Sequence, residues 1–310
     1  MVHNPPLLAL YAATAVSSAL SGVDEPNRTA MVPPLVGDEA LPAAFALKHA
    51  GFNAAAIAGP AVAGLVIARL GLPAAYALAA AGSGVAFVVT LPIRAMPARP
   101  EALAASGFAA VREALAFLKG RRLIQSTFAI DLVAMIFGLP RAVFPVLAVV
   151  QFHRGPEVVG ALFSALAVGA LVGAVMTGWV SRVRHQGQAV VLAVAIWGAA
   201  IVAFGLAGDR LWLALGLLAL AGGADVISAV FRNTLLQVSL PDRLRGRISA
   251  FHILVVTGGP RLGDIEAGIL ADAFTPAISV VSGGLLCLAG AALIALAFPE
   301  LRRFVAGQPS

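Results

Sequence analysis

Long runs of hydrophobic residues, separated by short polar connections, dominate the chain. A membrane-spanning helix needs about 20 mostly apolar residues, because the hydrocarbon core is about 30 Å thick and each helical residue rises about 1.5 Å. The sequence predicts nine such segments, with approximate bounds 6–33, 42–70, 74–93, 123–151, 158–181, 188–207, 211–239, 249–274 and 277–298. Strands are not expected, since an open sheet leaves its backbone unsatisfied in lipid and no ten-residue alternating pattern is present. The pattern therefore predicts an all-α membrane protein.

Composition agrees with this reading and narrows the function classes. Of the 310 residues, 60% are hydrophobic and 12% are charged, whereas soluble domains are about half apolar and about a quarter charged. The net charge of +6 comes from basic residues in the short connections, which is typical of residues that orient helices and not of nucleic-acid binding. We therefore expect a lipid bilayer, and no nucleic acid, as a partner.

Motifs for catalysis, metals or cofactors are missing from the sequence. Cys287 is the single cysteine, the five histidines lack metal-ligand spacing, and no phosphate-binding loop occurs. Residues 222–225 superficially resemble the Gly-x-Gly-Asp motif of intramembrane aspartyl proteases, but the second glycine is misplaced and no Tyr-Asp partner motif exists. We therefore expect no enzyme activity, no catalytic residue, no metal site and no cofactor.

The arginines predict the orientation of the helices. One set of connections is rich in arginine, and with the C-terminal tail it holds Arg94, Arg99, Arg112, Arg121, Arg122, Arg182, Arg184, Arg243, Arg245, Arg247, Arg302 and Arg303. The alternate set holds only Arg69, Arg154 and Arg210. Because cytoplasmic connections carry the basic excess, the C-terminus is predicted to be cytoplasmic. With an odd number of helices, the N-terminus is then outside the bacterial inner membrane.

One long connection divides the chain. We expect a partial N-terminal bundle over 1–95, a cytoplasmic linker over 96–121, a six-helix bundle over 122–300 and a cytoplasmic tail over 301–310. Within the linker, Phe108, Val111, Leu115 and Leu118 recur at helical spacing and predict an amphipathic helix. This helix is interpreted mainly as a tether between two bundles, and a position on the inner membrane surface is the alternative.

Ionisable residues are unevenly distributed among the apolar segments. Four segments contain them, and their candidate polar residues are Asp24, Arg28, Asp131, Arg141, Asp225, Arg232, Arg261, Asp264 and Glu266. Charged side chains inside a bilayer are costly and usually face a cavity or a partner. The segments that carry them are therefore predicted to line a shared polar site.

The depth of three residues sharpens this prediction. Asp131 lies about 14 Å from the cytoplasmic end of its segment and Asp225 about 21 Å from the outer end of its own, so both approach the midplane, and Arg261 lies at a comparable depth. A carboxylate that is alternately desolvated and paired can couple proton movement to transport. The alternative is a static ion pair of Asp131 or Asp225 with Arg261 or Arg232 that only holds helices together.

Small residues and prolines recur inside two of the apolar segments. The positions that we single out for helix packing or gating are Gly59, Pro60, Gly64, Gly259, Pro260 and Gly263. Small residues let helix backbones approach closely, and proline removes a hydrogen bond and kinks a helix. These positions suit a moving bundle, with tight packing alone as the alternative. Gly169, Gly173 and Gly178 are interpreted as a packing face.

Several stretches together resemble the permeases of the major facilitator superfamily, specifically the drug:proton antiporter branch that contains the enterobactin exporter. Residues 27–41 resemble the fourth family helix and its following turn, and residues 58–64 the antiporter motif of the fifth. Residues 131–141 resemble the seventh helix. Residues 241–247 resemble the loop between the tenth and eleventh helices, and residues 259–268 the eleventh. The resemblance covers nearly the whole chain.

The resemblance implies a twelve-helix fold in two halves, of which this chain begins at the fourth helix. The fourth, seventh and tenth helices then line a central cavity, with the eleventh at the interface of the halves. It implies proton-coupled export of a small amphiphilic molecule, such as a drug or siderophore, through a polar site centred on Asp131, Asp225 and Arg261. The expected cytoplasmic gate residues are Arg182, Arg243, Arg245 and Arg247. The alternative is a truncated, non-transporting membrane remnant or scaffold.

Overall fold

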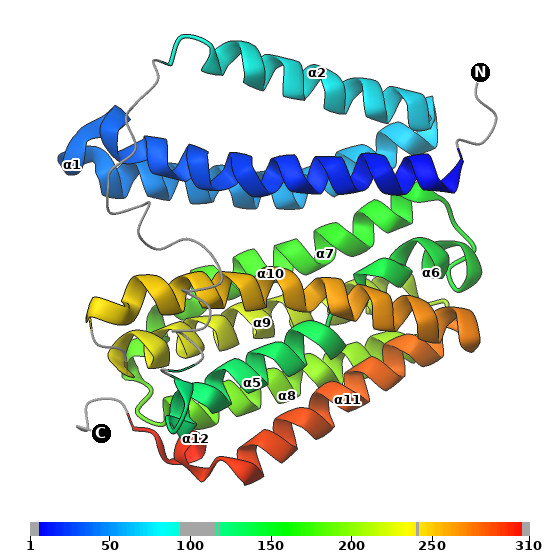
Figure 1. The fold of residues 1–310 in the computed structure, drawn as a ribbon. Coiled ribbons are helices and arrows are strands. Elements are labelled where there is room, and N and C mark those ends of the chain that lie inside the picture. The colour runs from blue at the N-terminus through cyan, green and yellow to red at the C-terminus, as the bar shows by residue number, and fades with distance from the viewer. Residues whose placement is uncertain (1–5, 94–115, 117, 240–241, 306–310) are drawn as a thin grey trace. The chain divides into compact units, whose positions relative to one another are not determined.

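The structure is helical wherever it is described. The computed structural model describes residues 6–93, 116, 118–239 and 242–305, and in these ranges it contains helices and no strand (Figure 1). The predicted all-α fold is therefore confirmed. Among these residues, seven stretches are long and apolar enough to cross a membrane: Ala50–Leu70, Leu72–Thr90, Arg122–Val150, Pro156–Val180, Gln186–Gly205, Leu211–Leu236 and Pro276–Ala297.

Two of the nine predicted segments are not among these seven. The segment predicted over 6–33 contributes a shorter apolar stretch, Leu7–Ser21. The segment predicted over 249–274 lies in helix α10 (Asp242–Ala273), which is long but carries Arg261, Asp264, Glu266 and Asp272. α10 is therefore the most polar long helix of the chain's C-terminal part, because it combines these charges with His252.

The chain forms two compact units, each described here by itself. The first comprises residues 1–53 and 89–98, and the second comprises residues 54–88 and 99–310. The first unit contains most of helix α1 (Leu7–Leu70), and α2 (Leu72–Thr90) lies almost wholly in the second. The domain boundaries expected near residues 95 and 121 remain a prediction.

Helix α1 is longer than either of the segments predicted within it. It is helical without interruption over 64 residues, so the predicted connection between residues 33 and 42 keeps helical backbone hydrogen bonding. A straight helix of that length would extend about 96 Å, roughly three times the thickness of a hydrocarbon core. α1 therefore has the length of two spans, and the predicted break at 33–42 is not a break in helical structure.

The second unit contains a bundle of six long helical segments that run along roughly a common direction (Figure 1). Their bounds are α5 Arg122–Phe137 with η1 Arg141–Val143 and α6 Phe144–Val150, α7 Pro156–Val175 with η2 Met176–Arg182, α8 Gln186–Gly205, α9 Leu211–Ser239, α10 Asp242–Ala273 and α11 Pro276–Ala297. A short helix, α12 (Pro299–Arg303), follows. α9 packs between α7 and α8, α8 packs on α11, and α5 contacts α9, α10 and α11.

The segment predicted over 123–151 is broken at its middle. α5 ends at Phe137, and Gly138, Leu139 and Pro140 separate it from η1. Proline has no backbone N–H to donate, and it disfavours helical geometry at the residue before it. The indole Nε1 of Trp197 on α8 donates a 2.9 Å hydrogen bond to the Gly138 carbonyl. A buried side chain thus satisfies a carbonyl at the break.

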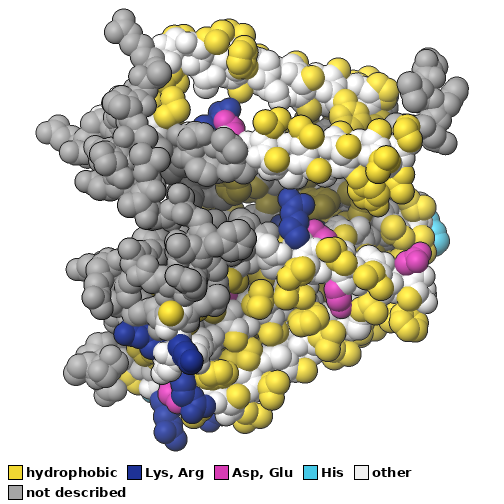
Figure 2. Space-filling view, in the orientation of Figure 1, with side chains coloured by type: hydrophobic (Ala, Val, Ile, Leu, Met, Phe, Trp, Pro, Cys, Tyr) yellow, Lys and Arg dark blue, Asp and Glu magenta, His cyan; other side chains and the backbone are white. Residues whose placement is uncertain are grey.

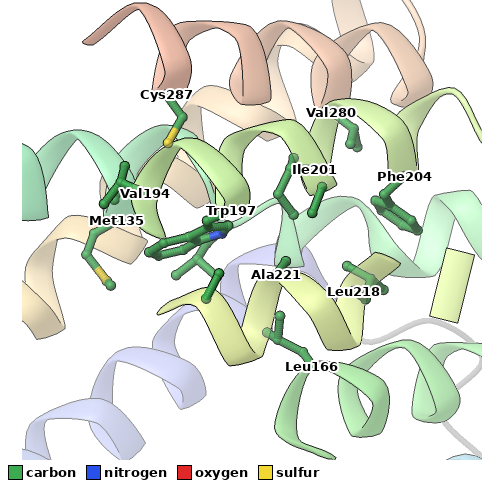
Figure 3. Close-up of a cluster of buried hydrophobic side chains, with 14 of the residues drawn as sticks. Met135, Leu166, Val194, Trp197, Ile201, Phe204, Leu218, Ala221, Val280 and Cys287 are labelled. Carbon is green, nitrogen blue, oxygen red and sulfur yellow. The ribbon is translucent and has the colours of Figure 1, made fainter. Parts of the chain in front are cut away.

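Large apolar side chains fill the centre of the bundle. Trp197, Ile201 and Phe204 point inward from α8 toward Leu218 and Ala221 on α9, with Val280 and Cys287 on α11 nearby (Figure 3). All of these residues are buried. Dispersion contacts at this density hold α8, α9 and α11 together even though lipid outside is equally apolar.

Glycines bring α7 and α9 into close contact. A Cβ on Gly173 would lie 2.8 Å from the Gly223 carbonyl oxygen, and a Cβ on Gly169 would overlap the Ala219 backbone. Gly222 is equally close to the backbone of Leu166. The predicted packing role of Gly169 and Gly173 therefore has a structural counterpart, whereas Gly178 has open space where its side chain would be.

Helix α10 begins earlier than the pattern predicts. It starts at Asp242, so the basic stretch 243–247, expected to form a loop, has a helical backbone. Pro260 lies inside this helix without ending it.

On the face of the molecule in Figure 2, hydrophobic side chains cover most of the described surface and charged groups are sparse, as suits a protein surrounded by lipid.

Candidate functional site

Helix α9 presents a polar stripe on one face. Asp225, Ser228 and Arg232 follow one another at spacings of three and four residues, so their side chains lie on the same side of the helix. Ser228 and Arg232 are buried. The Arg232 Nη1 atom donates a 2.6 Å hydrogen bond to Ser228 Oγ one turn earlier, which fixes the direction of the guanidinium.

The guanidinium of Arg232 pairs with Asp131 on α5. Arg232 Nη2 lies 2.9 Å from Asp131 Oδ1, and the two side chains are only 3% and 2% exposed. A fully buried pair of opposite charges is expensive to desolvate and must be closely matched to be tolerated. Asp131 is about 14 Å along α5 from Arg122, the first residue of the helix.

Two further ionisable side chains complete a four-residue cluster, which we call the charge cluster: Asp131, Asp225, Arg232 and His252. Arg232 Nη2 lies 3.7 Å from Asp225 Oδ1, and the Asp225 side chain is 27% exposed. On α10, His252 Nε2 lies 3.2 Å from Asp131 Oδ2. Three helices, α5, α9 and α10, thus direct ionisable groups to one place, although α5 is far from the other two in the sequence.

The charge cluster is incompletely satisfied within the described part of the chain. Asp131 Oδ1, Asp225 Oδ1 and Arg232 Nε are buried atoms without a hydrogen-bond partner there. The contact between Arg232 and Asp131 Oδ1 is therefore an ion pair without the alignment of a hydrogen bond. Buried carboxylate oxygens in this condition can accept a proton, a water molecule or a polar ligand group.

Arg261 does not join the cluster. Gly259 faces α5, where a Cβ would lie 2.9 Å from Met135 Cβ. Arg261 is two residues further along α10, about 200° around the helix, and its side chain is exposed. The sequence predicts that Asp131, Asp225 and Arg261 converge. In the structure, Asp131 and Asp225 instead converge on Arg232, a residue that the sequence also offers as a partner in a static ion pair.

The remaining predicted polar residues lie at different places. Asp264 and Glu266 are half-buried on α10, and Asp264 Oδ1 and Glu266 Oε1 accept no hydrogen bond from the described residues. Arg141 is exposed in η1. In the other unit, Arg28 Nε pairs with Asp24 Oδ2 at 2.6 Å, one turn apart on the exposed surface of α1.

The predicted gate residues are only partly described. Arg182 is exposed at the last position of η2. The side chains of Arg243, Arg245 and Arg247 lie outside the described residues. Most of the linker also lies outside them, and its Leu118 is buried against Ile124, Phe128, Leu236 and Ile248.

Four of the six singled-out glycines and prolines, Pro60, Gly64, Gly259 and Gly263, closely approach a neighbouring helix. A Cβ on Gly64 would lie 2.7 Å from the Pro156 carbonyl oxygen of α7, and Gly160 of α7 approaches Pro60 equally closely. A Cβ on Gly263 would overlap the Ile136 carbonyl of α5, one turn from Gly259. Gly59 has open space around it, and Pro260 lies inside α10. The backbones of α10 and α5 thus meet through small residues beside the charge cluster.

Sequence reasoning missed Ser228 and His252. Ser228 could have been found from its position between Asp225 and Arg232 on one helical face. His252 could have been found because it precedes Gly259 by seven residues, two helical turns, and so shares the face that packs on α5. Among the described residues, no group of three or more His, Cys, Asp or Glu side chains could hold a metal ion.

Open apolar cavities lie away from the cluster. One, of 880 Å³, is lined by α7, α8 and α9, including Val172, Leu192 and Ile227. Another, of 570 Å³, lies between α1 and α7 beside Gly64 and Gly160. Both have almost entirely apolar walls, as expected for grooves that contact lipid chains, and neither contains a residue of the charge cluster.

Comparison with known proteins places the chain in a family. Residues 3–306 match the family of transmembrane secretion effectors of the major facilitator superfamily. The chain is 30% identical to the enterobactin exporter EntS of Citrobacter koseri over 313 residues, which cover 98% of this chain and 72% of that protein. It is 29% identical to EntS of Shigella boydii serotype 18 and 28% identical to EntS of Escherichia coli O139:H28, with the same coverage.

No solved structure matches the chain, so the fold and the family are supported by the helices and the sequence matches. The predicted resemblance is confirmed over nearly the full length of the chain. The protein belongs to the transmembrane secretion effector family of the major facilitator superfamily, a family of membrane transporters that includes exporters.

Proposed function

We propose that this protein exports a small amphiphilic molecule, such as a drug or siderophore, across the bacterial inner membrane in exchange for protons. The observation that carries the proposal is the buried ion pair of Asp131 and Arg232, joined by Asp225 and His252 within an apolar bundle. The proposed orientation, with the C-terminus in the cytoplasm and the N-terminus outside, follows the distribution of arginines.

A purely structural role explains the charge cluster poorly. A buried ion pair is often no more stabilising than well-packed apolar side chains of similar volume, and the neighbouring helix contacts of this bundle are made with apolar and small residues. Intramembrane ionisable residues that face one another mark ion or substrate pathways more often than they stabilise a fold. The cluster is therefore assigned to the coupling of proton and substrate movement.

The composition of the cluster supports proton coupling. Two carboxylates and one guanidinium give a formal charge of −2 + 1 = −1 when His252 is neutral. A net charge in a desolvated site is unfavourable, so the cluster gains from binding one proton. Loss of that proton changes the charge on the interface between α5, α9 and α10, where small residues permit these helices to shift.

The substrate class follows the similarity to enterobactin exporters and to the drug:proton branch. The other predicted residues have secondary proposed roles: Arg261, Asp264, Glu266 and Arg141 along the transport path, Asp24 and Arg28 on α1, and Arg182, Arg243, Arg245 and Arg247 at the cytoplasmic gate. The proposed partners are the substrate, protons and the bilayer.

The test uses inverted membrane vesicles that contain the full chain, with enterobactin and ethidium as probes. If the protein is an exporter, acidifying the interior of the vesicles should drive both probes, enterobactin and ethidium, into the vesicles. Asp131→Asn keeps the size of the side chain but removes its charge, so gradient-driven uptake should fall by about tenfold or more, because the cluster can no longer exchange a proton for substrate.

A matched control is Asp272→Asn, because Asp272 is exposed near the end of α10, away from the cluster. This variant should transport like the wild type. Equal transport by Asp131→Asn and the wild type would refute the role of Asp131. If the wild type transports neither probe above vesicles that lack the protein, the alternative of a non-transporting membrane remnant or scaffold is favoured.

A further inference from the structure

His252 connects the buried ion pair to a more accessible environment. Its side chain is 23% exposed, whereas that of Asp131, 3.2 Å away, is 2% exposed. Its ring also meets Phe128 edge to face, with ring centroids 5.8 Å apart. Within the charge cluster, His252 and Asp225 are therefore both partly exposed, and His252 contacts the carboxylate oxygen of Asp131 opposite to the one paired with Arg232.

A groove leads from the start of α5 toward His252. Its volume is 390 Å³, and its lining includes Lys119 and Gln125 near the start of α5 and Phe128, Leu132 and Val255 further along. Val255 follows His252 by one helical turn, and Phe128 touches the His252 ring. The groove therefore extends from the end of α5 that is predicted to be cytoplasmic to Phe128 and Val255, two neighbours of His252, and His252 itself is not part of its lining.

We propose that His252 is the residue that carries the coupling proton, and that it releases this proton to water in the groove between α5 and α10. This inference rests on the proposed function and assigns the proton to a specific atom. In the loaded state, His252 Nε2–H donates to Asp131 Oδ2 and the cluster has a formal charge of −2 + 2 = 0. On release, the N–H bond breaks, its electron pair stays on Nε2, and a water molecule in the groove takes the proton.

Histidine suits this role better than the two carboxylates do. Histidine is the side-chain type best suited to binding and releasing a proton near neutral pH. Asp131 is already engaged by Arg232 at 2.9 Å, and Asp225 lies 3.7 Å from the same guanidinium. The proton on His252 also competes with Arg232 for Asp131, which links protonation to the contact between α5 and α9.

The other ionisable groups near His252 are few in the described part of the chain. α5 contributes Asp131, with Lys119 just before the helix at the groove. α9 contributes Asp225 and Arg232 of the charge cluster, and the two other elements that pack against α10, η1 and α11, contain the exposed Arg141 and the buried thiol of Cys287.

The test compares His252→Gln with the wild type in proteoliposomes that contain the full chain. Glutamine retains a hydrogen-bond donor for Asp131 but cannot carry the proton. Gradient-driven transport of enterobactin or ethidium should fall by about tenfold or more and lose its pH dependence between about pH 5.5 and 7.5. Exchange of labelled for unlabelled probe without a gradient should stay within about twofold of the wild type, because exchange needs no net proton movement.

Two further variants make the result decisive. His185→Gln, at the exposed residue before α8, should behave like the wild type. His252→Arg places a permanent positive charge beside Asp131, and it should abolish net coupled transport while retaining exchange. Loss of exchange together with coupling in both His252 variants would overturn the inference, and so would a pH profile and proton-to-substrate ratio unchanged in His252→Gln.

A measurement without substrate separates this inference from the proposed function. The ¹⁵N signal of His252, assigned by its absence in His252→Gln, should change as Nε2 gains and loses its proton when the pH of the detergent-solubilised protein is varied. If the His252 signal of the wild-type protein responds to pH but the protein transports neither probe, the result contradicts export and still supports His252 as the proton site. A wild type that transports while the signal stays constant contradicts the proton site alone.

Discussion

Helix α9 makes two contacts of opposite character with its neighbours. Toward α7 it presents Ala219, Gly222 and Gly223, and the backbones meet without any charged group. Toward α5 and α10 it presents Asp225, Ser228 and Arg232, which meet Asp131 and, beyond it, His252. We call these the glycine contact and the charge cluster. The same helix is thus held by shape on one side and by charge on the other.

The difference teaches which contact has a structural role and which a functional one. Close backbone packing gives dispersion energy that depends on shape and changes little with pH. An ion pair in a desolvated site depends on the protonation of its members and costs energy to keep. A transporter needs one contact that stays formed and another that can change, and under the proposed function α9 would supply both.

Removal of Arg232 should have the largest effect on stability. Arg232→Gln leaves Asp131 and Asp225 facing each other without a cation, and breaking a buried pair in this way costs about 3–5 kcal/mol. We expect the free energy of unfolding to fall by about that amount. The measurement is unfolding of the detergent-solubilised protein in increasing sodium dodecyl sulfate.

Two companions show whether charge is the cause. The double variant Asp131→Asn with Arg232→Gln should regain a large part of the lost stability, because less unpaired charge remains buried. Arg210→Gln, at an exposed position between α8 and α9, should leave the midpoint of unfolding in sodium dodecyl sulfate unchanged. A double variant as unstable as Arg232→Gln alone would mean that the guanidinium acts through packing instead of charge.

The glycine contact should show the next largest effect. Gly169→Ala places a methyl group where the Ala219 backbone lies, and overpacking of this kind costs about 1–3 kcal/mol. Gly216→Ala is the matched control, because nothing lies within 4 Å of a Cβ at that position on α9. Gly169→Ala should unfold at a lower temperature than the wild type, and this difference should not change with pH, because the close contact involves no ionisable group. Equal unfolding temperatures for the two variants would contradict the role of the close backbone contact.

The helices were largely predictable because their apolar runs match the solvent in which they fold. The run predicted over 211–239 coincides with α9, and that over 277–298 differs from α11 by one residue at each end. Features that depend on local backbone chemistry were less visible. The break at Gly138–Pro140 interrupts an apolar run without changing its hydrophobicity, and the basic start of α10 was interpreted as a loop.

Part of the charge cluster could be predicted from helical periodicity, and the rest depends on how the helices are rotated. Asp225 and Arg232 are seven residues apart, so periodicity alone puts them on one face of α9. Which residue of α10 meets Asp131 depends on how that helix is rotated, and the close approach of Gly259 and Gly263 to α5 sets this rotation. Depth along the helix favoured Arg261, but rotation selects His252, and histidine is not among the Asp, Glu, Lys and Arg side chains on which the prediction was based.

The smallest effect is expected for an ion pair that resembles the charge cluster in chemistry but not in burial. Arg122 Nε lies 3.2 Å from Glu300 Oε1, with the two side chains 56% and 41% exposed. Exposed pairs contribute about 0–1 kcal/mol, because water screens their attraction. Glu300→Gln should therefore lower the free energy of unfolding by less than about 1 kcal/mol.

Arg122 also keeps two other contacts at the start of α5 that do not need Glu300. Its Nη2 donates to the Ala297 carbonyl at 2.8 Å, and its guanidinium lies 5.6 Å from the centre of the Phe298 ring. These contacts should hold α5 and the end of α11 together in Glu300→Gln, with unchanged transport. A loss as large as that of Arg232→Gln would show that burial is not what distinguishes the two pairs, and the assignment of function to the charge cluster would then lose its physical basis.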